Sequence, residues 1–422
     1  MDPPSTKVAP SHFLDGKTIL VSGAGIAGLA FAVALAHQFA GETSTTRPRV
    51  IIFERDSYEE RVGREGYTLS LRTEYNAGGG QILDRLGLYE QVRSVSVNAK
   101  EGAVEGGSFN VWHPDFRPFV RLAAQPIGPK RLVGMRIRRN ALQKVLAHAA
   151  IDSGAEIHWQ SAVASAKRIK DGRVEVSLDN GSIISGDILI AADGSRSKLG
   201  SLLRPNHDLD YAGVYCWSGI AKYASPEAIP KPVNRDWGVV VGAKDGLGGF
   251  FSPVDETSSL WCFSRRTSEP KEPLRYPIPQ DRLDRLMEET TDAAASLAPL
   301  VKNLVSATNP DTVMQFNAMD RKPFSHSIST DGPSIYIGDA NHAVSPFAGA
   351  GANLALMDAW DLAAAMKNCS SLGEAVKAYD ALAVPRASKI LKISHWTIDI
   401  VHATGIKLLL YTLILRVLGL FA

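Results

Sequence analysis

The sequence has few cysteines, no long basic run and no long hydrophobic run. Its 422 residues include only three cysteines, Cys216, Cys262 and Cys369, which are far apart and show no C-x-x-C spacing. Such a set supports neither a disulfide framework nor a zinc site, and it favours a reducing compartment. With 46 Lys and Arg against 44 Asp and Glu, the net charge of +2 provides no basic field for a nucleic-acid partner.

The two ends of the chain also lack a secretory signal and a spanning helix. Residues 1–16 open with a proline-rich stretch that has no apolar core, so we expect a disordered lead-in. Residues 404–422 are strongly apolar, but their longest uncharged run is far shorter than the roughly 20 residues of a spanning helix. This tail fits either a helix packed on the protein body or a membrane-associated helix whose Lys407 and Arg416 reach the headgroups. We expect a cytoplasmic protein, with peripheral membrane contact through 404–422 as the alternative.

Organised structure begins with a strand, a glycine-rich turn and an apolar helix. Residues 17–39 read KTILVSGAGIAGLAFAVALAHQF, and a buried strand, VIIFER, follows at residues 50–55. This β-α-β order predicts two parallel strands joined by a right-handed crossover. Between residues 157 and 190 we expect further strands, with a hairpin turn at residues 179–182.

The middle of the chain has a different pattern. From about residue 211 to residue 316, short alternating strands such as GVYCWSGIAKY and SSLWCFSRR are separated by proline and glycine. This pattern predicts an antiparallel sheet that forms a separate lobe. Helical patterns follow at residues 353–367 and 372–403.

The glycine-rich turn at residues 23–28 has the context of a dinucleotide-binding fingerprint. Its first glycine permits a tight turn, the second lets the backbone approach a pyrophosphate, and the third lets helix and strand pack closely. The helix that opens here directs its first N–H groups at the phosphates. The residues expected there are Gly23, Gly25, Ile26, Ala27 and Gly28.

An acid ends the second strand of this unit. Glu54, followed by Arg55, can accept hydrogens from both hydroxyls of a ribose. An acid at this position favours an unphosphorylated ribose, and so FAD or NAD over NADP. Later motifs must decide between these two cofactors.

Two later segments complete a recognisable order of motifs. Residues 187–200, DILIAADGSRSKLG, form a strand that ends in Asp-Gly, and residues 338–359, GDANHAVSPFAGAGANLALMDA, combine Gly-Asp, a small-residue loop and a helix. With the first glycine turn, these motifs resemble the three fingerprints of the class A flavoprotein monooxygenases. That family includes para-hydroxybenzoate hydroxylase, salicylate hydroxylase-like enzymes and tetracycline-degrading monooxygenases. The resemblance covers nearly all of residues 17–383.

The resemblance implies that one FAD is held at both ends. The first glycine turn would hold the diphosphate, Asp339 would bind the ribityl chain, and the loop at 349–353 would present N–H groups to the isoalloxazine. Asp193 belongs to the fingerprint that the family links to FAD and pyridine nucleotide, and Arg139 matches the arginine of its Arg-x-x-Leu helix. The loop residues are Gly349, Ala350, Gly351, Ala352 and Asn353, and secondary candidates beside the flavin are Arg64, Tyr67 and Arg72.

The chain departs from the family at two positions. Ser218, in Trp-Ser-Gly, stands where many aromatic hydroxylases of the family have arginine, so phenol hydroxylation is not implied, and epoxidation and Baeyer–Villiger insertion stay open. Asn341 stands where alanine is common and leaves the loop intact. No catalytic residue is assigned; the weak candidates are Arg72, His342 and Pro346, and for His342 a structural place in the loop is the preferred interpretation.

Aromatic residues of the predicted lobe are candidates for an apolar substrate pocket. Alternate strand positions are also commonly filled by core aromatics, so both interpretations remain open. The lobe aromatics that could line such a pocket are Trp217, Trp237, Phe250, Phe251, Trp261 and Phe263. The predicted pocket set is Trp217, Phe251, Trp261 and, from the second glycine loop, Phe347.

Together these features predict an α/β fold: a Rossmann-like FAD-binding domain with an inserted antiparallel β-sheet substrate lobe and a helical C-terminal tail. The predicted parts are residues 17–205 and 317–370 for the FAD domain, with part of the sheet at 60–135 facing the substrate, residues 206–316 for the lobe and residues 371–422 for the C-terminal helices.

The resemblance implies an FAD-dependent monooxygenase that takes electrons from NADPH or NADH and transfers one oxygen atom of O2 through a flavin C4a-hydroperoxide. We find no second strand-linked glycine fingerprint, so the electron donor is expected to dock transiently. A lobe rich in aromatics favours a hydrophobic aromatic or polycyclic substrate in secondary metabolism. The alternatives are a related reductase or halogenase, or a non-catalytic binding protein on the FAD fold.

Overall fold

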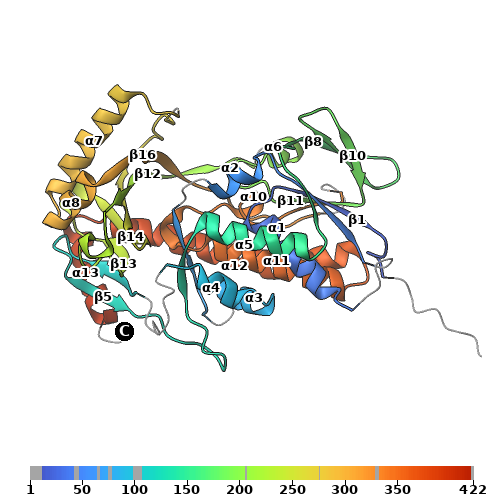
Figure 1. Cartoon of the computed structure of the whole chain (residues 1–422), viewed down its shortest axis with the longest axis horizontal. Coiled ribbons are helices and arrows are strands. Elements are labelled where there is room, and N and C mark those ends of the chain that lie inside the picture. Colours follow the sequence, from blue (N-terminus) through green and yellow to red (C-terminus); the bar gives the residue numbers. More distant parts are fainter. Residues whose placement is uncertain are drawn as a thin grey trace, which may run out of the picture.

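The computed structural model describes residues 12–41, 47–63, 67–74, 78–97, 107–204, 207–274, 276–327 and 332–419. The molecule is elongated, with a parallel sheet at one end, a larger sheet at the other and long helices between them (Figure 1). The longer helices are α1 (Ile26–Gln38), α5 (Arg139–Asp152), α7 (Gln280–Ala295), α11 (Gly351–Asn368), α12 (Leu372–Val401) and α13 (Gly405–Gly419). The shorter ones are α2 (Tyr58–Gly63), α3 (Gly79–Arg85), α4 (Tyr89–Ser94), α6 (Lys198–Leu203), α8 (Pro299–Ser306), α10 (Asp339–His342), η1 (Pro226–Ala228), η2 (Lys244–Gly246) and η3 (Pro346–Ala348).

Five parallel strands form the sheet at one end of the molecule, which we call the parallel-sheet half. Their order is β17 (Ser334–Tyr336), β11 (Ile188–Ala191), β1 (Thr18–Ser22), β2 (Arg49–Phe53) and β7 (Glu156–His158). Leu20 lies at the centre, in register with Ile51 on one side and Leu189 on the other. The predicted β-α-β unit is confirmed, because β1 and β2 pair in parallel and α1 connects them.

Helix α1 is buried on nearly all sides by the rest of the protein. Its first ten residues, from Ile26 to Leu35, are all buried. It packs against α5 and α11, and its side chains belong to the same apolar core as Ile19 and Val21 of β1. The start of this helix is therefore fixed rigidly at the end of β1.

Two small sheets extend this half. Strands β8 (Val163–Arg168), β9 (Val174–Leu178) and β10 (Ile183–Gly186) are antiparallel, and the predicted hairpin turn at 179–182 joins β9 to β10. Strands β3 (Thr68–Leu71) and β6 (Met135–Arg138) pair antiparallel, with Ser70 in register with Arg136. Strand β3 also contacts β14 of the large sheet, so this ribbon lies where the two halves meet.

The large sheet has seven strands. Their order is β16 (Thr308–Asp320), β12 (Asp210–Lys222), β15 (Ser258–Arg266), β14 (Gly248–Asp255), β13 (Trp237–Val240), β4 (Phe109–Trp112) and β5 (Pro118–Leu122). All neighbours are antiparallel except β4 and β13, which are parallel. Residues 109–122 therefore join the lobe from the earlier part of the chain, and β16 continues beyond residue 316 to Asp320.

The C-terminal helices run back across both halves. Helix α12 packs on α11 and on η3, and α13 contacts β5 of the large sheet. The inner residues of α13, Leu408, Tyr411 and Leu415, share an apolar cluster with Val120 and Val241 of the sheet region. The first interpretation of the tail, a helix packed on the body of the protein, agrees with this arrangement.

Candidate functional site

The turn between β1 and α1 requires glycine for steric reasons. Gly23 has φ +102°, and a Cβ there would lie 2.6 Å from the carbonyl oxygen of Ala192. A Cβ on Gly28 would lie 2.1 Å from the Gly23 carbonyl oxygen, which no side chain can tolerate. No side chain of the described residues caps the start of α1 at Gly25. A close backbone turn with an uncapped helix start fits a diphosphate.

Glu54 lies beneath this turn, buried to 3% exposure. Its Oε2 accepts the Ala24 N–H at 2.8 Å, and its Oε1 accepts the Asp56 N–H at 3.2 Å. These two bonds fix the carboxylate of Glu54 against the turn, where the family resemblance expects the acid that binds a ribose. The neighbouring Arg55 is exposed and pairs with Asp56 at 3.5 Å. Its guanidinium lies at the surface beside the turn.

The second glycine loop places the Asp339 side chain at the surface. The preceding Gly338 has φ +58° and donates its N–H to Asp358 Oδ2 at 2.9 Å. The Asp339 side chain is accessible to solvent, yet the surrounding protein desolvates it and raises the pKa of its carboxyl. An exposed carboxylate at the start of this loop can accept hydrogen bonds from the hydroxyls of a ribityl chain.

The loop at residues 349–353 leaves open space above its backbone. Gly349 is exposed with φ +58°, and a Cβ there would meet only Arg72 Nη2, at 3.9 Å. A Cβ on Gly351 would meet only Asp339 Oδ1, also at 3.9 Å. Helix α11 begins at Gly351, and no described side chain caps it. This second uncapped helix start fits the electron-rich edge of a flavin ring.

Asn353 and Arg72 hold the two sides of this loop together. Asn353 Oδ1 accepts the N–H groups of Arg72 at 2.9 Å and Gly79 at 3.0 Å, and its amide donates to the Ser70 carbonyl at 2.8 Å. The Arg72 guanidinium donates to the Ala348 carbonyl at 2.7 Å. The side chains of these two candidates thus organise the loop, which leaves its backbone for a cofactor.

The remaining predicted cofactor residues lie around the same region. The Arg139 N–H donates to the Tyr67 carbonyl at 3.2 Å, and the Tyr67 side chain is 46% exposed. Arg139 also lies near enough to Asp339 to lower the pKa of its carboxyl, opposing the effect of burial. Arg64 lies outside the described residues.

Arg321 connects the second and third fingerprints and was missed by sequence reasoning. Its guanidinium donates to the carbonyls of Ser195, Asp339 and Ala340 at 3.0–3.1 Å.

In the Asp-Gly fingerprint, Asp193 Oδ1 is buried without a hydrogen-bond partner among the described residues. Burial raises the pKa of this carboxyl. A buried oxygen that has no hydrogen-bond partner among the described residues fits a site that a ligand completes.

His342 is part of the scaffold beneath the loop. Its Nε2 lies 2.7 Å from Asp358 Oδ2, and Asp358 also accepts from Arg386 at 3.0 Å. Burial opposes protonation of His342, but Asp358 outweighs it and raises the pKa of the imidazole. A buried imidazole held by a buried carboxylate stabilises the fold of the loop, in agreement with the preferred interpretation. Asn341 has a similar role, because its amide bonds both the N–H and the carbonyl of Phe324.

Three of the four predicted pocket residues lie in the core of the lobe. Trp217, Phe251 and Trp261 are fully buried and pack with side chains of α7 and α8. The two indole N–H groups are satisfied, by Thr290 at 3.1 Å and by Thr308 at 2.8 Å. These three side chains fill the core, which is the alternative that the sequence left open.

The opposite face of the sheet meets the second glycine loop. Since strand residues alternate, the neighbours of the core aromatics point the other way. Phe250, Cys262 and Phe316 are only partly buried, and Phe347 packs with Cys262 and Phe316 against one small apolar cluster that includes Cys216 and Ile398. Pro346, beside Phe347, is exposed. This partly exposed apolar face has the position that a substrate next to the flavin loop would need.

A buried arginine borders the same face and was also missed. Arg136 is 6% exposed and lies 5.6 Å from the Phe250 ring and 5.8 Å from the Trp237 ring. It donates to Ser70 Oγ and Ser252 Oγ, both at 2.7 Å, and no carboxylate of the described residues pairs with it. Burial lowers its pKa to about 9, so it remains a cation at neutral pH. It is a charge within the interface between the two halves.

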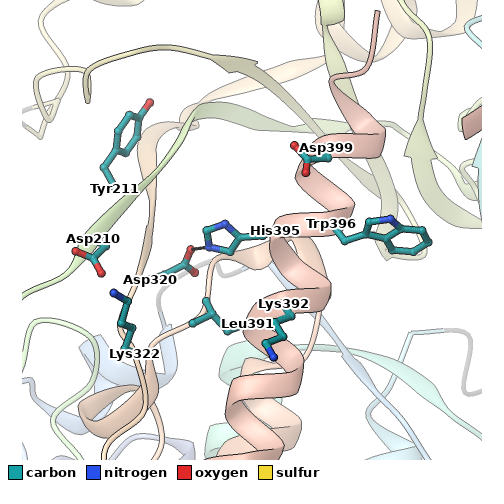
Figure 2. Close-up of a pocket in the computed structure, with 9 residues that line it drawn as sticks. All are labelled: Asp210, Tyr211, Asp320, Lys322, Leu391, Lys392, His395, Trp396 and Asp399. Carbon is teal, nitrogen blue, oxygen red and sulfur yellow. Dashed lines mark hydrogen bonds and ion pairs between the residues drawn. The ribbon is translucent and has the colours of Figure 1, made fainter. Parts of the chain in front are cut away.

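A separate open cavity of about 460 Å³ lies between α12 and the ends of β12 and β16. Figure 2 shows His395 and Asp320 at its centre, with Lys322 and Lys392 to one side. His395 Nε2 is 2.8 Å from Asp320 Oδ2, and the other oxygen of Asp320 accepts the Ser345 N–H at 2.5 Å. Asp320 therefore supports the segment that leads into Pro346.

Comparisons with known proteins agree with this geometry. The FAD binding domain family matches residues 17–394. Monooxygenase cfoF of Aspergillus candidus is 34% identical over 93% of each chain. Zeaxanthin epoxidase of Spinacia oleracea is 26% identical, and the match covers 82% of this chain but only 47% of that one. The chain thus spans about half the length of this relative.

Solved structures share the fold. HpxO of Klebsiella pneumoniae, complexed with FAD and uric acid, superposes with a TM-score of 0.74 at 23% identity, over 97% of this chain and 95% of that one. Tetracycline destructase Tet(51) gives a TM-score of 0.64 at 18% identity, over 96% and 97%. With the fingerprints and the two glycine loops in place, the chain belongs to the FAD-dependent monooxygenases of the class A flavoprotein hydroxylase family.

Proposed function

We propose that this enzyme uses NADPH or NADH and O2 to insert one oxygen atom into a hydrophobic aromatic or polycyclic small molecule, as a step of secondary metabolism. The observation that carries the proposal is the partly buried apolar face of Phe250, Cys262 and Phe316: Phe250 and Cys262 are cross-strand partners, and Cys262 and Phe316 share an apolar cluster with Phe347 of the second glycine loop. Similarity to monooxygenase cfoF supports the reaction class.

The chain's own residues supply position and environment for this reaction. Gly23 and Gly28 would let the backbone approach the diphosphate, and the Asp339 carboxylate would bind the ribityl hydroxyls. The start of α11 would stabilise negative charge on the flavin edge. FAD, when bound, supplies the redox and oxygen-transfer chemistry.

The loop that would lie beside the flavin contributes apolar surface to this site. Phe347 packs on the apolar cluster below the sheet face, and Arg72 fixes Ala348 directly after it. A dry site protects reactive oxygen species from side reactions with water. Ser218, on the same strand face as Cys216, gives no cation for a phenolate, so hydroxylation, epoxidation and Baeyer–Villiger insertion are all consistent with this site.

The proposal is tested by incubating the FAD-loaded enzyme with NADPH or NADH, ¹⁸O2 and a panel of polycyclic aromatic compounds, followed by mass spectrometry. We expect one ¹⁸O atom in the product, and no label when ¹⁸O is supplied as water. NAD(P)H oxidation with label only in peroxide or water would contradict the proposal and favour a reductase. Chloride incorporation would favour a halogenase, and a protein that cannot be loaded with FAD would favour a binding protein.

A further inference from the structure

Helix α13 exposes an apolar stripe on its outer side. Each of six aliphatic side chains is at least 44% exposed, and their spacing of three and four residues places them along one side of the helix. They are Ile406 (77%), Leu409 (71%), Leu410 (57%), Leu413 (62%), Ile414 (44%) and Val417 (47%). We call this set the outer face of α13.

The outer face takes no part in packing α13 against the rest of the protein. The inner side of the same helix already packs on the sheet through Leu408, Tyr411 and Leu415. Scattered exposed aliphatics are common, but a contiguous stripe of six marks an interaction surface. The helix lies at the end of the molecule formed by the seven-stranded sheet, where another surface can reach it (Figure 1).

The charge along this segment of the chain is of one sign. Residues 400–422 contain no Asp or Glu, while Lys407 and Arg416 are both exposed near the two ends of the helix. Exposed cations that flank an aliphatic stripe complement the negative headgroups of an anionic bilayer. The sequence beyond Val417, LGLFA, continues the apolar character.

The chemistry of the face favours lipid over a protein partner. Protein interfaces combine an aromatic or arginine-rich centre with direct hydrogen bonds. The outer face has only aliphatic groups, and its charges lie at its ends. Within the described residues no single helix is long and apolar enough to cross a membrane; α12 and α13 together have a suitable length and composition, but they are bent by 115°.

We propose that the outer face of α13 docks into the interface of an anionic phospholipid bilayer, with the helix parallel to the membrane plane. Lys407 and Arg416 would contact headgroups while the aliphatic stripe enters the acyl boundary. This docking would hold the seven-stranded sheet, and the apolar face beside the flavin loop, close to the membrane. It does not depend on which substrate the enzyme oxidises.

The test uses the full-length FAD-loaded protein and sedimentation with vesicles of phosphatidylcholine, with or without phosphatidylserine. We expect binding to the phosphatidylserine vesicles that weakens as salt increases. The double variant L409S/L413S removes two outward leucines and should weaken binding by at least about tenfold. The variant K407Q/R416Q should lose the preference for phosphatidylserine.

The matched control is I183S, which removes an aliphatic side chain of β10 that is 61% exposed and distant in sequence from α13. It should bind vesicles like the wild type. Thermal unfolding and FAD content should be unchanged in all variants, because the substituted side chains face outward. Failure of the wild type to bind vesicles, or equal binding by L409S/L413S, would overturn the proposal. So would light scattering that shows a wild-type dimer which L409S/L413S converts to a monomer, because a second copy would then cover the face.

Discussion

The two halves of the molecule specify their sites in different ways. In the parallel-sheet half, backbone contacts dictate residue type, since a Cβ on Gly28 would lie 2.1 Å from the Gly23 carbonyl oxygen. In the seven-stranded sheet, residue type does not decide which side chains face the core, because Phe250 and Phe251 are the same residue yet face opposite sides of the sheet. A motif therefore points to the proposed cofactor site, whereas the phase of a strand points to the proposed substrate face.

The largest expected effect is a difference in stability between substitutions at Phe251 and at Phe250. Phe251→Ala removes a fully buried ring from the lobe core, and we expect a loss of about 3–5 kcal/mol in the free energy of unfolding. Phe250→Ala, on the partly exposed face, should cost less than about 2 kcal/mol and should change KM for the substrate. Urea unfolding and steady-state kinetics measure the two effects. Equal destabilisation with no change in KM for Phe250→Ala would show that both faces are core.

The second prediction concerns the steric requirement for glycine in the other half. Gly28→Ala places a methyl group against the Gly23 carbonyl, so α1 must move from β1. We expect about 3 kcal/mol of destabilisation and loss of FAD. Gly87→Asn is the control, because Gly87 has a left-handed φ of +72° with no atom within 4 Å of its Cβ position. Flavin absorbance should be normal in the control; normal flavin content in Gly28→Ala would refute the assignment of the turn.

A third prediction concerns His402, which contacts both the large sheet and the second glycine loop. Its ring lies 2.9 Å from Ser264 Oγ of β15, and its centroid is 5.7 Å from that of the Phe347 ring. Burial lowers the pKa of this imidazole from 6.5 to about 4. The unfolded chain binds this proton below pH 6.5 and the folded chain only near pH 4, so stability falls as the pH drops through that window. The loss should approach about 3 kcal/mol at pH 4. Thermal melts of His402→Gln should show a flatter acid limb, and an unchanged limb would exclude this contribution.

The smallest effect is expected at Arg136. Its buried charge has no carboxylate partner among the described residues, so the cost of desolvation offsets much of what its bonds to Ser70 and Ser252 contribute. Arg136→Met should therefore change the free energy of unfolding by less than about 2 kcal/mol. Urea denaturation measures this, and a much larger loss would show that the hydroxyl network needs the guanidinium.

Local patterns predicted much of the fold and the positions of the two glycine loops. The β-α-β unit, the hairpin at 179–182 and the start of α11 follow from glycine positions and apolar periodicity. The pocket face did not follow, because GGFFSP shows that strand residues alternate but not which phenylalanine faces the core. Arg321 was also invisible, since its contact with Ser195 joins positions 126 residues apart and has no local signature.

The central claim is that one FAD is held by both glycine loops. It is tested most directly by titrating apoprotein of wild type and Asp339→Ala with FAD and with ADP, which lacks the ribityl and flavin parts. Because hydrogen bonds to a carboxylate contribute about 1.5–3 kcal/mol, Asp339→Ala should raise the Kd of FAD at least about tenfold and leave the Kd of ADP unchanged. Equal affinity of both proteins for FAD would contradict the account.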